Sequence, residues 1–254
     1  MSLPVTPSFR LDDRRALVTG AGRGIGLAAA AALADVGAEV TLVARSPQDI
    51  EKTAADILAA GGSAVAVTLD VSDLGAVREF FDTRSAFHVV VNNAGTNRPM
   101  AMTQVTEADF DAVLDLNVKS AFFVAQAAAQ RMIAEKVAGS LIHIGSQMGH
   151  VGGINRSLYC ASKWAIEGMN KAFALDLAAH RIRSNTIAPT FIETPLTQPY
   201  FADEAFRASV LAKIKLGRLG QVQDLMGAIV FLASDASALM TGSSMLIDGG
   251  WTAD

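Results

Sequence analysis

Two side chains suited to proton transfer, Tyr159 and Lys163, lie four positions apart in a helical pattern. Residues at this spacing share one face of a helix, so both can point into one site. A tyrosine with its ordinary pKa near 10 is a poor base at neutral pH, but a cation within about 4 to 6 Å favours its ionised form. The pair therefore predicts a general acid/base that exchanges a proton with a substrate oxygen. Because such pairs also arise by chance on helix surfaces, the neighbouring motifs must support this interpretation.

A serine, Ser146, lies thirteen residues before Tyr159, at the end of an apolar run. Its hydroxyl can hydrogen-bond a substrate oxygen and stabilise the charge that develops there. The surrounding segment Gly145–Gly149 does not place the serine at the centre of a G-x-S-x-G motif, which argues against a hydrolase.

A glycine-rich turn runs from Thr19 to Gly26, between an apolar strand pattern and a helical pattern. Glycines let a backbone approach a pyrophosphate closely, and the first turn of a helix offers free N–H groups. The spacing is G-x-x-x-G-x-G, unlike the P-loop of ATPases and GTPases. It predicts a dinucleotide site, with an ordinary, closely packed strand-to-helix loop as the alternative. The candidate residues are Gly20, Arg23, Gly24, Ile25 and Gly26.

The second apolar run ends in Arg45 and Ser46, where NAD-binding folds usually carry Asp or Glu. A guanidinium and a hydroxyl can hold a ribose 2′-phosphate, and Arg23 in the glycine turn can assist them. These residues therefore favour NADP as the cofactor and leave NAD possible. The alternative is that both arginines are solvated surface residues.

Short runs rich in Val and Ile alternate with longer alanine-rich stretches, a pattern typical of parallel strands joined by crossover helices. The expected strands are 15–19, 39–44, 64–69, 89–92, 140–145, 183–188 and 244–247, and the expected helices are 25–36, 48–60, 73–84, 107–136, 158–179 and 221–233. We therefore expect an α/β fold: a single domain over residues 1–254 with a doubly wound, seven-stranded parallel sheet and helices on both faces. The stretch 190–216, rich in proline and aromatic residues, is expected to form a mobile substrate flap of short helices. Each candidate residue follows a strand or lies on the next helix, where open parallel sheets bind ligands.

The composition excludes several classes of protein. The 254 residues are 51% apolar and 18% charged, which suits one large domain. The net charge of -4 predicts no nucleic-acid partner, and the longest small-residue run, 25–34, is too short to span a membrane. One cysteine, Cys160, and a start without signal-peptide features predict a cytoplasmic protein. The four histidines lack metal-ligand spacing, so we expect no metal.

Together these motifs resemble those of the short-chain dehydrogenase/reductase family. The likeness extends from about Leu11 to Trp251 and includes T-G-x-x-x-G-x-G, N-N-A-G, a helical Asn, an active-site Ser and Y-x-x-x-K. In this chain they are Thr19–Gly26, Asn92–Gly95, Asn117, Ser146, and Tyr159 with Lys163. The resemblance implies a Rossmann fold and an oxidoreductase that interconverts a secondary alcohol and a ketone by hydride transfer.

The resemblance also implies roles for individual residues. The catalytic set is Asn117, Ser146, Tyr159 and Lys163, with Asn117 helping to hold a water that links Lys163 to solvent. Cofactor contacts are expected from Asp70, Val71, Asn93, Ala94, Gly95, Tyr159, Lys163, Pro189, Ile192 and Thr194. The family's usual Pro-Gly after the sixth strand is Pro189-Thr190 here, and a β-branched residue resists positive φ. A homotetramer is implied as well.

The loops after the fourth, fifth and sixth strands carry polar side chains, which suit a sugar, polyol or sugar acid. The substrate-binding candidates are Arg98, Gln147, His150 and Arg156, although the two arginines could be solvated loop residues. Within the family the chain is most similar to the gluconate 5-dehydrogenase and 3-oxoacyl-carrier-protein reductase types, and the polar loops favour the former. A non-catalytic NADP-sensing regulatory protein is a further alternative, but it has no use for a complete catalytic set.

Overall fold

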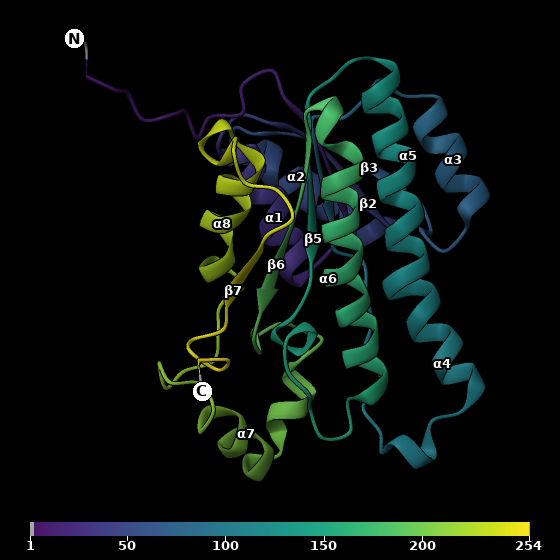
Figure 1. Ribbon diagram of the computed structural model, residues 1–254, viewed down its shortest axis with the longest axis vertical. Coiled ribbons are helices and arrows are strands. Elements are labelled where there is room, and N and C mark those ends of the chain that lie inside the picture. Colours follow the sequence, from purple (N-terminus) through teal and green to yellow (C-terminus); the bar gives the residue numbers. More distant parts are fainter. Residues whose placement is uncertain (1–2, 254) are drawn as a thin grey trace.

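The computed structural model describes residues 3–253, which are built around a seven-stranded parallel sheet (Figure 1). The strand order is β3-β2-β1-β4-β5-β6-β7. The bounds are β1 (Arg15–Thr19), β2 (Glu39–Ala44), β3 (Ser63–Thr68), β4 (Val89–Asn92), β5 (Gly139–Ile144), β6 (Ile182–Pro189) and β7 (Ser244–Ile247). The central strand β4 is buried on both faces, which explains its run of three valines, Val89–Val91.

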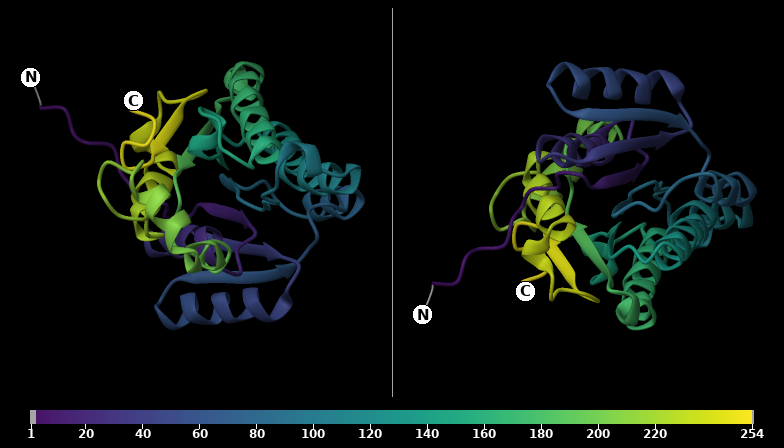
Figure 2. Two further views of the ribbon diagram at one scale, coloured as in Figure 1. Left: turned by 90° about the horizontal axis from the view of Figure 1, so that it is seen from below. Right: turned by 90° about the horizontal axis from the view of Figure 1, so that it is seen from above.

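Helices cover both faces of the sheet. On one face α1 (Gly24–Asp35), α2 (Pro47–Ala59) and α8 (Gln223–Ala233) share an apolar cluster. On the other face α3 (Leu74–Asp82), α5 (Ser120–Ala134) and α6 (Ser157–Leu177) share a second cluster. Figure 2 shows α5 and α6 on the opposite side of the sheet from α8. Residues 3–253 contain no helix with the length and apolar character needed to cross a bilayer.

Every expected strand is present, and the bounds of the expected helices agree within two residues. The stretch 107–136 was expected to form one regular helix. In the structure it contains two helices, α4 (Glu107–Leu114) and α5, which are joined by a π-turn, Asp115–Lys119. The backbone N–H of Ser120 bonds the Asp115 carbonyl oxygen five residues back, and the Ser120 hydroxyl donates to the same oxygen at 2.8 Å. A hydrophobic pattern of helical period does not reveal such an inserted residue.

The proposed flap stretch contains two short helices, η5 (Gln198–Ala202) and α7 (Glu204–Leu211). The Asp203 carboxylate accepts hydrogen bonds from two backbone N–H groups and so fixes the start of α7. The Phe191 ring centre lies 5.7 Å from that of Trp251, so the C-terminal segment packs against this stretch. Together they form a small apolar core separate from the two main clusters.

Candidate active site

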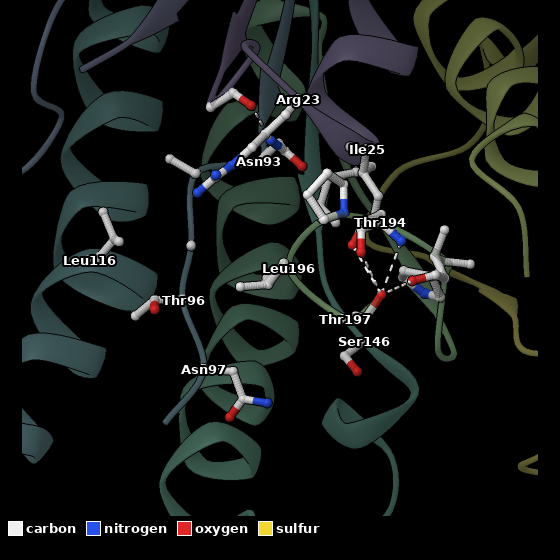
Figure 3. Close-up of a pocket in the computed structure, with 18 of the residues that line it drawn as sticks. Arg23, Ile25, Asn93, Thr96, Asn97, Leu116, Ser146, Thr194, Leu196 and Thr197 are labelled. Atoms are coloured by element: carbon white, nitrogen blue, oxygen red, sulfur yellow. Dashed lines mark hydrogen bonds between the residues drawn. The ribbon is translucent and has the colours of Figure 1, made fainter. Parts of the chain in front are cut away.

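A cavity of about 510 Å³ lies at the carboxyl edge of the sheet, on both sides of the point where the strand order reverses. This volume is in the range of ligand-binding pockets. Figure 3 shows Arg23 and Asn93 at one end of the cavity and Asn97 and Ser146 at the other. The first end is formed by the glycine-rich turn, and the second by the loops that follow β4 and β5.

The glycine-rich turn brings the first turn of α1 to the cavity. Gly20 and Gly24 have φ values of 64° and 56°, which other residues rarely adopt. A Cβ at Gly26 would collide with the Gly20 carbonyl oxygen, so Gly26 lets α1 begin directly against β1 rather than lining the cavity. The Asn93 side chain donates from Nδ2 to the carbonyl oxygen of Thr19 at 2.9 Å and stabilises the turn. The exposed N–H groups of such a helix start suit a pyrophosphate.

Cationic side chains line the wall next to this turn. Arg23, Arg45 and the Ser46 hydroxyl all border the cavity, as does Asp49 from the first turn of α2. Burial acts to raise the pKa of the Asp70 carboxyl, but hydrogen bonds from Ser72 and the nearby Arg45 guanidinium outweigh it and lower the pKa. The glycine cradle and the two guanidinium groups therefore fit a dinucleotide that carries an additional phosphate.

Tyr159 and Lys163 both line the cavity from the first turns of α6. The Lys163 Nζ lies 5.6 Å from the centre of the Tyr159 ring. It also donates a hydrogen bond of 2.7 Å to the Ile144 carbonyl oxygen at the end of β5. Helix and strand together hold the ammonium beside the phenol.

Burial changes the pKa of both groups. It raises the pKa of Tyr159 to about 12, although the Ser146 hydroxyl acts in the opposite direction. It lowers the pKa of Lys163 to about 8, although the Glu167 carboxylate acts in the opposite direction. Glu167 is itself buried, and its Oε2 accepts a 2.8 Å hydrogen bond from Thr186 Oγ1. The protein's own groups therefore keep the phenol protonated at neutral pH.

Ser146 follows β5 and faces the same space. Its hydroxyl donates to Gln147 Oε1 at 2.8 Å and accepts from the backbone N–H of Met148 at 3.1 Å. Both Ser146 and Gln147 line the cavity and are buried. The serine is thus held by its neighbours at the end of the cavity that Tyr159 also lines.

Asn117 lies in the π-turn and is buried behind the cavity wall rather than in its lining. Its amide exchanges hydrogen bonds with the backbone of Thr96, at 2.8 and 2.9 Å, and donates to Ser162 Oγ at 3.0 Å. Asn117 therefore ties the loop after β4 to α6, next to Lys163. Its expected role in holding a water stays a prediction.

The loop after β6 brings Pro189, Ile192 and Thr194 to the cavity. Thr190 is not among the described residues with positive φ, so the backbone here does not require the glycine that the family usually carries. The Thr197 hydroxyl donates to the Ile192 carbonyl oxygen and accepts from the Thr194 N–H, as the dashed lines of Figure 3 show. These hydrogen bonds fix the shape of the loop.

The four substrate-binding candidates divide into two pairs. Gln147 and Arg156 line the cavity, whereas Arg98 and His150 do not. Arg98 forms a 2.7 Å ion pair with Asp109, and the His150 Nε2 lies 3.0 Å from Ser244 Oγ. Their side chains have partners elsewhere, so the structure does not bring them into the site.

Nearly all cofactor-binding candidates line the cavity, Gly26 being the exception. They are Gly20, Arg23, Gly24, Ile25, Arg45, Ser46, Asp70, Val71, Asn93, Ala94, Gly95, Tyr159, Lys163, Pro189, Ile192 and Thr194. The sequence interpretation missed Asp49, Leu116 and Leu196, which also line it. Only Asp49 had a usable signal, because it lies in the first turn of a helix that begins directly after Ser46.

The comparisons with known proteins agree with this geometry. Residues 20–252 match a family model described as enoyl-(acyl carrier protein) reductase. The chain belongs to the short-chain dehydrogenase/reductase family. It is an oxidoreductase of the kind that acts on CH–OH groups with NAD(P). No group of three or more His, Cys, Asp or Glu side chains in residues 3–253 is placed to hold a metal ion.

Three similar family members illustrate the range of relatives. A 2-dehydro-3-deoxy-D-gluconate 5-dehydrogenase of Escherichia coli K12 is 36% identical, with 98% of this chain and 99% of the relative aligned. A D-erythrulose reductase of Gallus gallus is 34% identical over 96% of this chain and 98% of the relative. The crystal structure of a gluconate 5-dehydrogenase from Burkholderia cenocepacia J2315, in complex with NADP and tartrate, has a TM-score of 0.92 and 36% identity over 97% of this chain and 98% of that one.

Proposed function

We propose that this oxidoreductase interconverts a secondary alcohol and a ketone on a polyhydroxylated substrate: a sugar, a polyol or a sugar acid. The observation that carries the proposal is the polar character of the cavity end next to Ser146. There the Oδ1 atom of Asn97 is buried without a hydrogen-bond partner among the described residues. Asn97, Ser146 and Gln147 all line this end of the cavity, so their side chains provide hydrogen-bonding groups for substrate hydroxyls. The sugar and sugar-acid relatives support the same class.

The residues divide the chemistry between them. NADP(H) supplies or accepts the hydride, and its oxidised ring adds a positive charge to the site. The Tyr159 hydroxyl donates a proton to the substrate oxygen during reduction and accepts one during oxidation. Lys163 lowers the cost of the phenolate by its charge, and the Ser146 hydroxyl hydrogen-bonds the substrate oxygen as charge develops on it.

NADP is the proposed cofactor in preference to NAD. Arg23, Arg45 and Ser46 border the cavity next to the glycine-rich turn and can hold a 2′-phosphate. Of the carboxylates on α2, only Asp49 borders this part of the cavity. The NADP-bound relative supports this choice.

The second candidate is a 3-oxoacyl-carrier-protein reductase. The description of the matching family model, an acyl-carrier-protein reductase, favours it. The buried polar atoms at the substrate end of the cavity favour the sugar-type substrate, because an acyl chain offers no hydroxyls along its length.

The proposal includes a homotetramer in the cytoplasm and a flap that moves. Large apolar side chains are exposed on the outer faces of α4, α5 and α6, as expected of an interface, among them Phe110, Phe122, Trp164 and Leu175. The lone Cys160 offers no internal disulfide, as is usual in a reducing compartment. Sedimentation equilibrium tests the assembly, because a monomer would contradict it.

The decisive experiment follows the absorbance of the reduced cofactor with a panel of keto sugars, keto acids, polyols, sugar acids and acyl thioesters. We expect turnover with at least one polyhydroxylated compound. Turnover confined to acyl thioesters would establish the second candidate. Tight NADP binding without any turnover would contradict both.

A further inference from the structure

Arg156 is a buried cation without an anionic partner. The residue is only 7% exposed and lines the cavity together with Tyr159. The one hydrogen bond of its side chain within residues 3–253 runs from Nη1 to the Asn155 carbonyl oxygen at 3.3 Å, and no carboxylate in that range forms an ion pair with it. A guanidinium has five N–H donors. Burying its charge without a counter-charge is costly, so the arrangement needs an explanation.

The local backbone holds the Arg156 stem in place. Asn155, directly before it, has a φ of 57°, a left-handed conformation that Asn tolerates better than most residues. A Cβ at Gly153 would lie 3.2 Å from both Cβ and Cγ of Arg156, so the glycine makes room for the stem. The Arg156 carbonyl oxygen accepts a 2.7 Å hydrogen bond from the Cys160 N–H, which anchors the residue at the start of α6.

Aromatic rings surround the guanidinium but do not satisfy its donors. The Arg156 Cζ lies 5.7 Å from the ring centre of Tyr200 and 5.9 Å from that of Phe206. Cation–π contacts of this kind stabilise the charge, yet they leave the in-plane N–H groups available. Burial lowers the pKa of the guanidinium, while Tyr200, Tyr159 and Cys160 act in the opposite direction; no carboxylate contributes. Arginine remains charged at neutral pH all the same.

We propose that Arg156 binds the carboxylate of the substrate and selects sugar acids over uncharged sugars and polyols. The planar guanidinium can donate to both carboxylate oxygens at once. Arg156 and Tyr159 are three positions apart at the start of α6, so their side chains lie on the same side of the helix. One small molecule can therefore place its carboxylate at Arg156 and its reacting carbon at Tyr159. This inference rests on the proposed function and narrows its substrate class.

The test measures binding to the NADPH-loaded enzyme by isothermal titration calorimetry. D-gluconate and D-sorbitol form the first pair of probes, because they differ only in a carboxylate replacing a CH₂OH group; D-galactonate and galactitol form the second. We expect the wild type to bind at least one aldonate about 10- to 100-fold more tightly than its alditol. Arg156→Gln should remove this preference by weakening aldonate binding far more than alditol binding. Arg156→Lys should retain part of the aldonate preference, because the positive charge remains. It should lose the rest, because an ammonium group cannot form the paired hydrogen bonds.

Arg98→Gln is the matched control, since Arg98 is a loop arginine outside the cavity lining. It should keep the full aldonate preference. Equal binding of aldonate and alditol by the wild type would overturn the proposal, as would a preference that survives in Arg156→Gln. If that variant does not bind NADPH, an undiminished preference in Arg156→Lys overturns the proposal instead. Failure of the proposed function is a separate result, seen as absent NADP(H) turnover while the binding preference persists.

Discussion

Lys163 and Glu167 lie one helical turn apart on α6, and the buried carboxylate raises the pKa of the buried ammonium against the effect of burial. Glu167→Gln removes this charge, so the pKa of Lys163 should fall below its value of about 8. As the pH is raised, the rate of ketone reduction should then begin to fall at a lower pH than in the wild type, because Lys163 loses its proton at a lower pH. A pH profile of kcat measures this. Glu51→Gln, at an exposed position, should leave the profile in place.

Replacing Tyr159 by Phe tests the proposed acid/base directly. The variant keeps the ring and loses only the hydroxyl, so turnover should fall by about 10²- to 10⁴-fold. NADPH affinity, measured by the fluorescence of the bound cofactor, should stay close to that of the wild type. Full activity in this variant would refute the mechanism.

Asn97→Ala removes a side-chain amide that lines the substrate end of the cavity. We expect kcat/KM for the best polyhydroxylated substrate to fall about 3- to 10-fold, the usual effect of losing one neutral hydrogen bond. The loss should be in KM rather than in NADPH affinity. Unchanged kinetics would show that no substrate hydroxyl contacts the Asn97 side chain.

Arg45→Ala tests the choice of cofactor. The affinity for NADPH should fall about tenfold or more, since a charge-assisted hydrogen bond to the 2′-phosphate is lost. NADH affinity should barely change. The exposed Arg78 on α3 provides the control Arg78→Ala, which should affect neither cofactor. Tighter binding of NADH than of NADPH by the wild type would contradict the assignment.

His143 should make the fold sensitive to acid. Burial lowers its pKa from 6.5 to about 4, and nearby Lys163 adds to the effect. The unfolded chain binds the extra proton first, so stability falls as the pH decreases from 6.5 to 4, with a ceiling of about 3 kcal/mol. Thermal unfolding of His143→Phe should show a smaller loss over this range than the wild type. His180→Gln, at an exposed site, should behave like the wild type.

The sheet and its helices could be predicted because burial on both faces leaves a readable pattern. The apolar run of β4 and the alanine-rich face of α1 follow from the packing that each must form. The glycine turn and the Tyr159–Lys163 spacing were predictable for a similar reason, since both act through local geometry.

Contacts between distant segments could not be predicted in the same way. Arg98 and Arg156 are both loop arginines in the sequence, and only the fold shows that one meets Asp109 while the other is buried in the cavity. The partners of Glu167 come from β6 and β7, far along the chain. Sequence spacing carries no information about such pairs.

The π-turn at Asp115–Lys119 sets the angular phase between α4 and α5. Deleting one residue there would restore a regular helix, but it would rotate α4 relative to α5 by about 100° around the helix axis. Asn117 could then no longer meet Thr96 and Ser162 while α5 kept its apolar side on the sheet. The segment from α4 through α5 should therefore tolerate no change in its length.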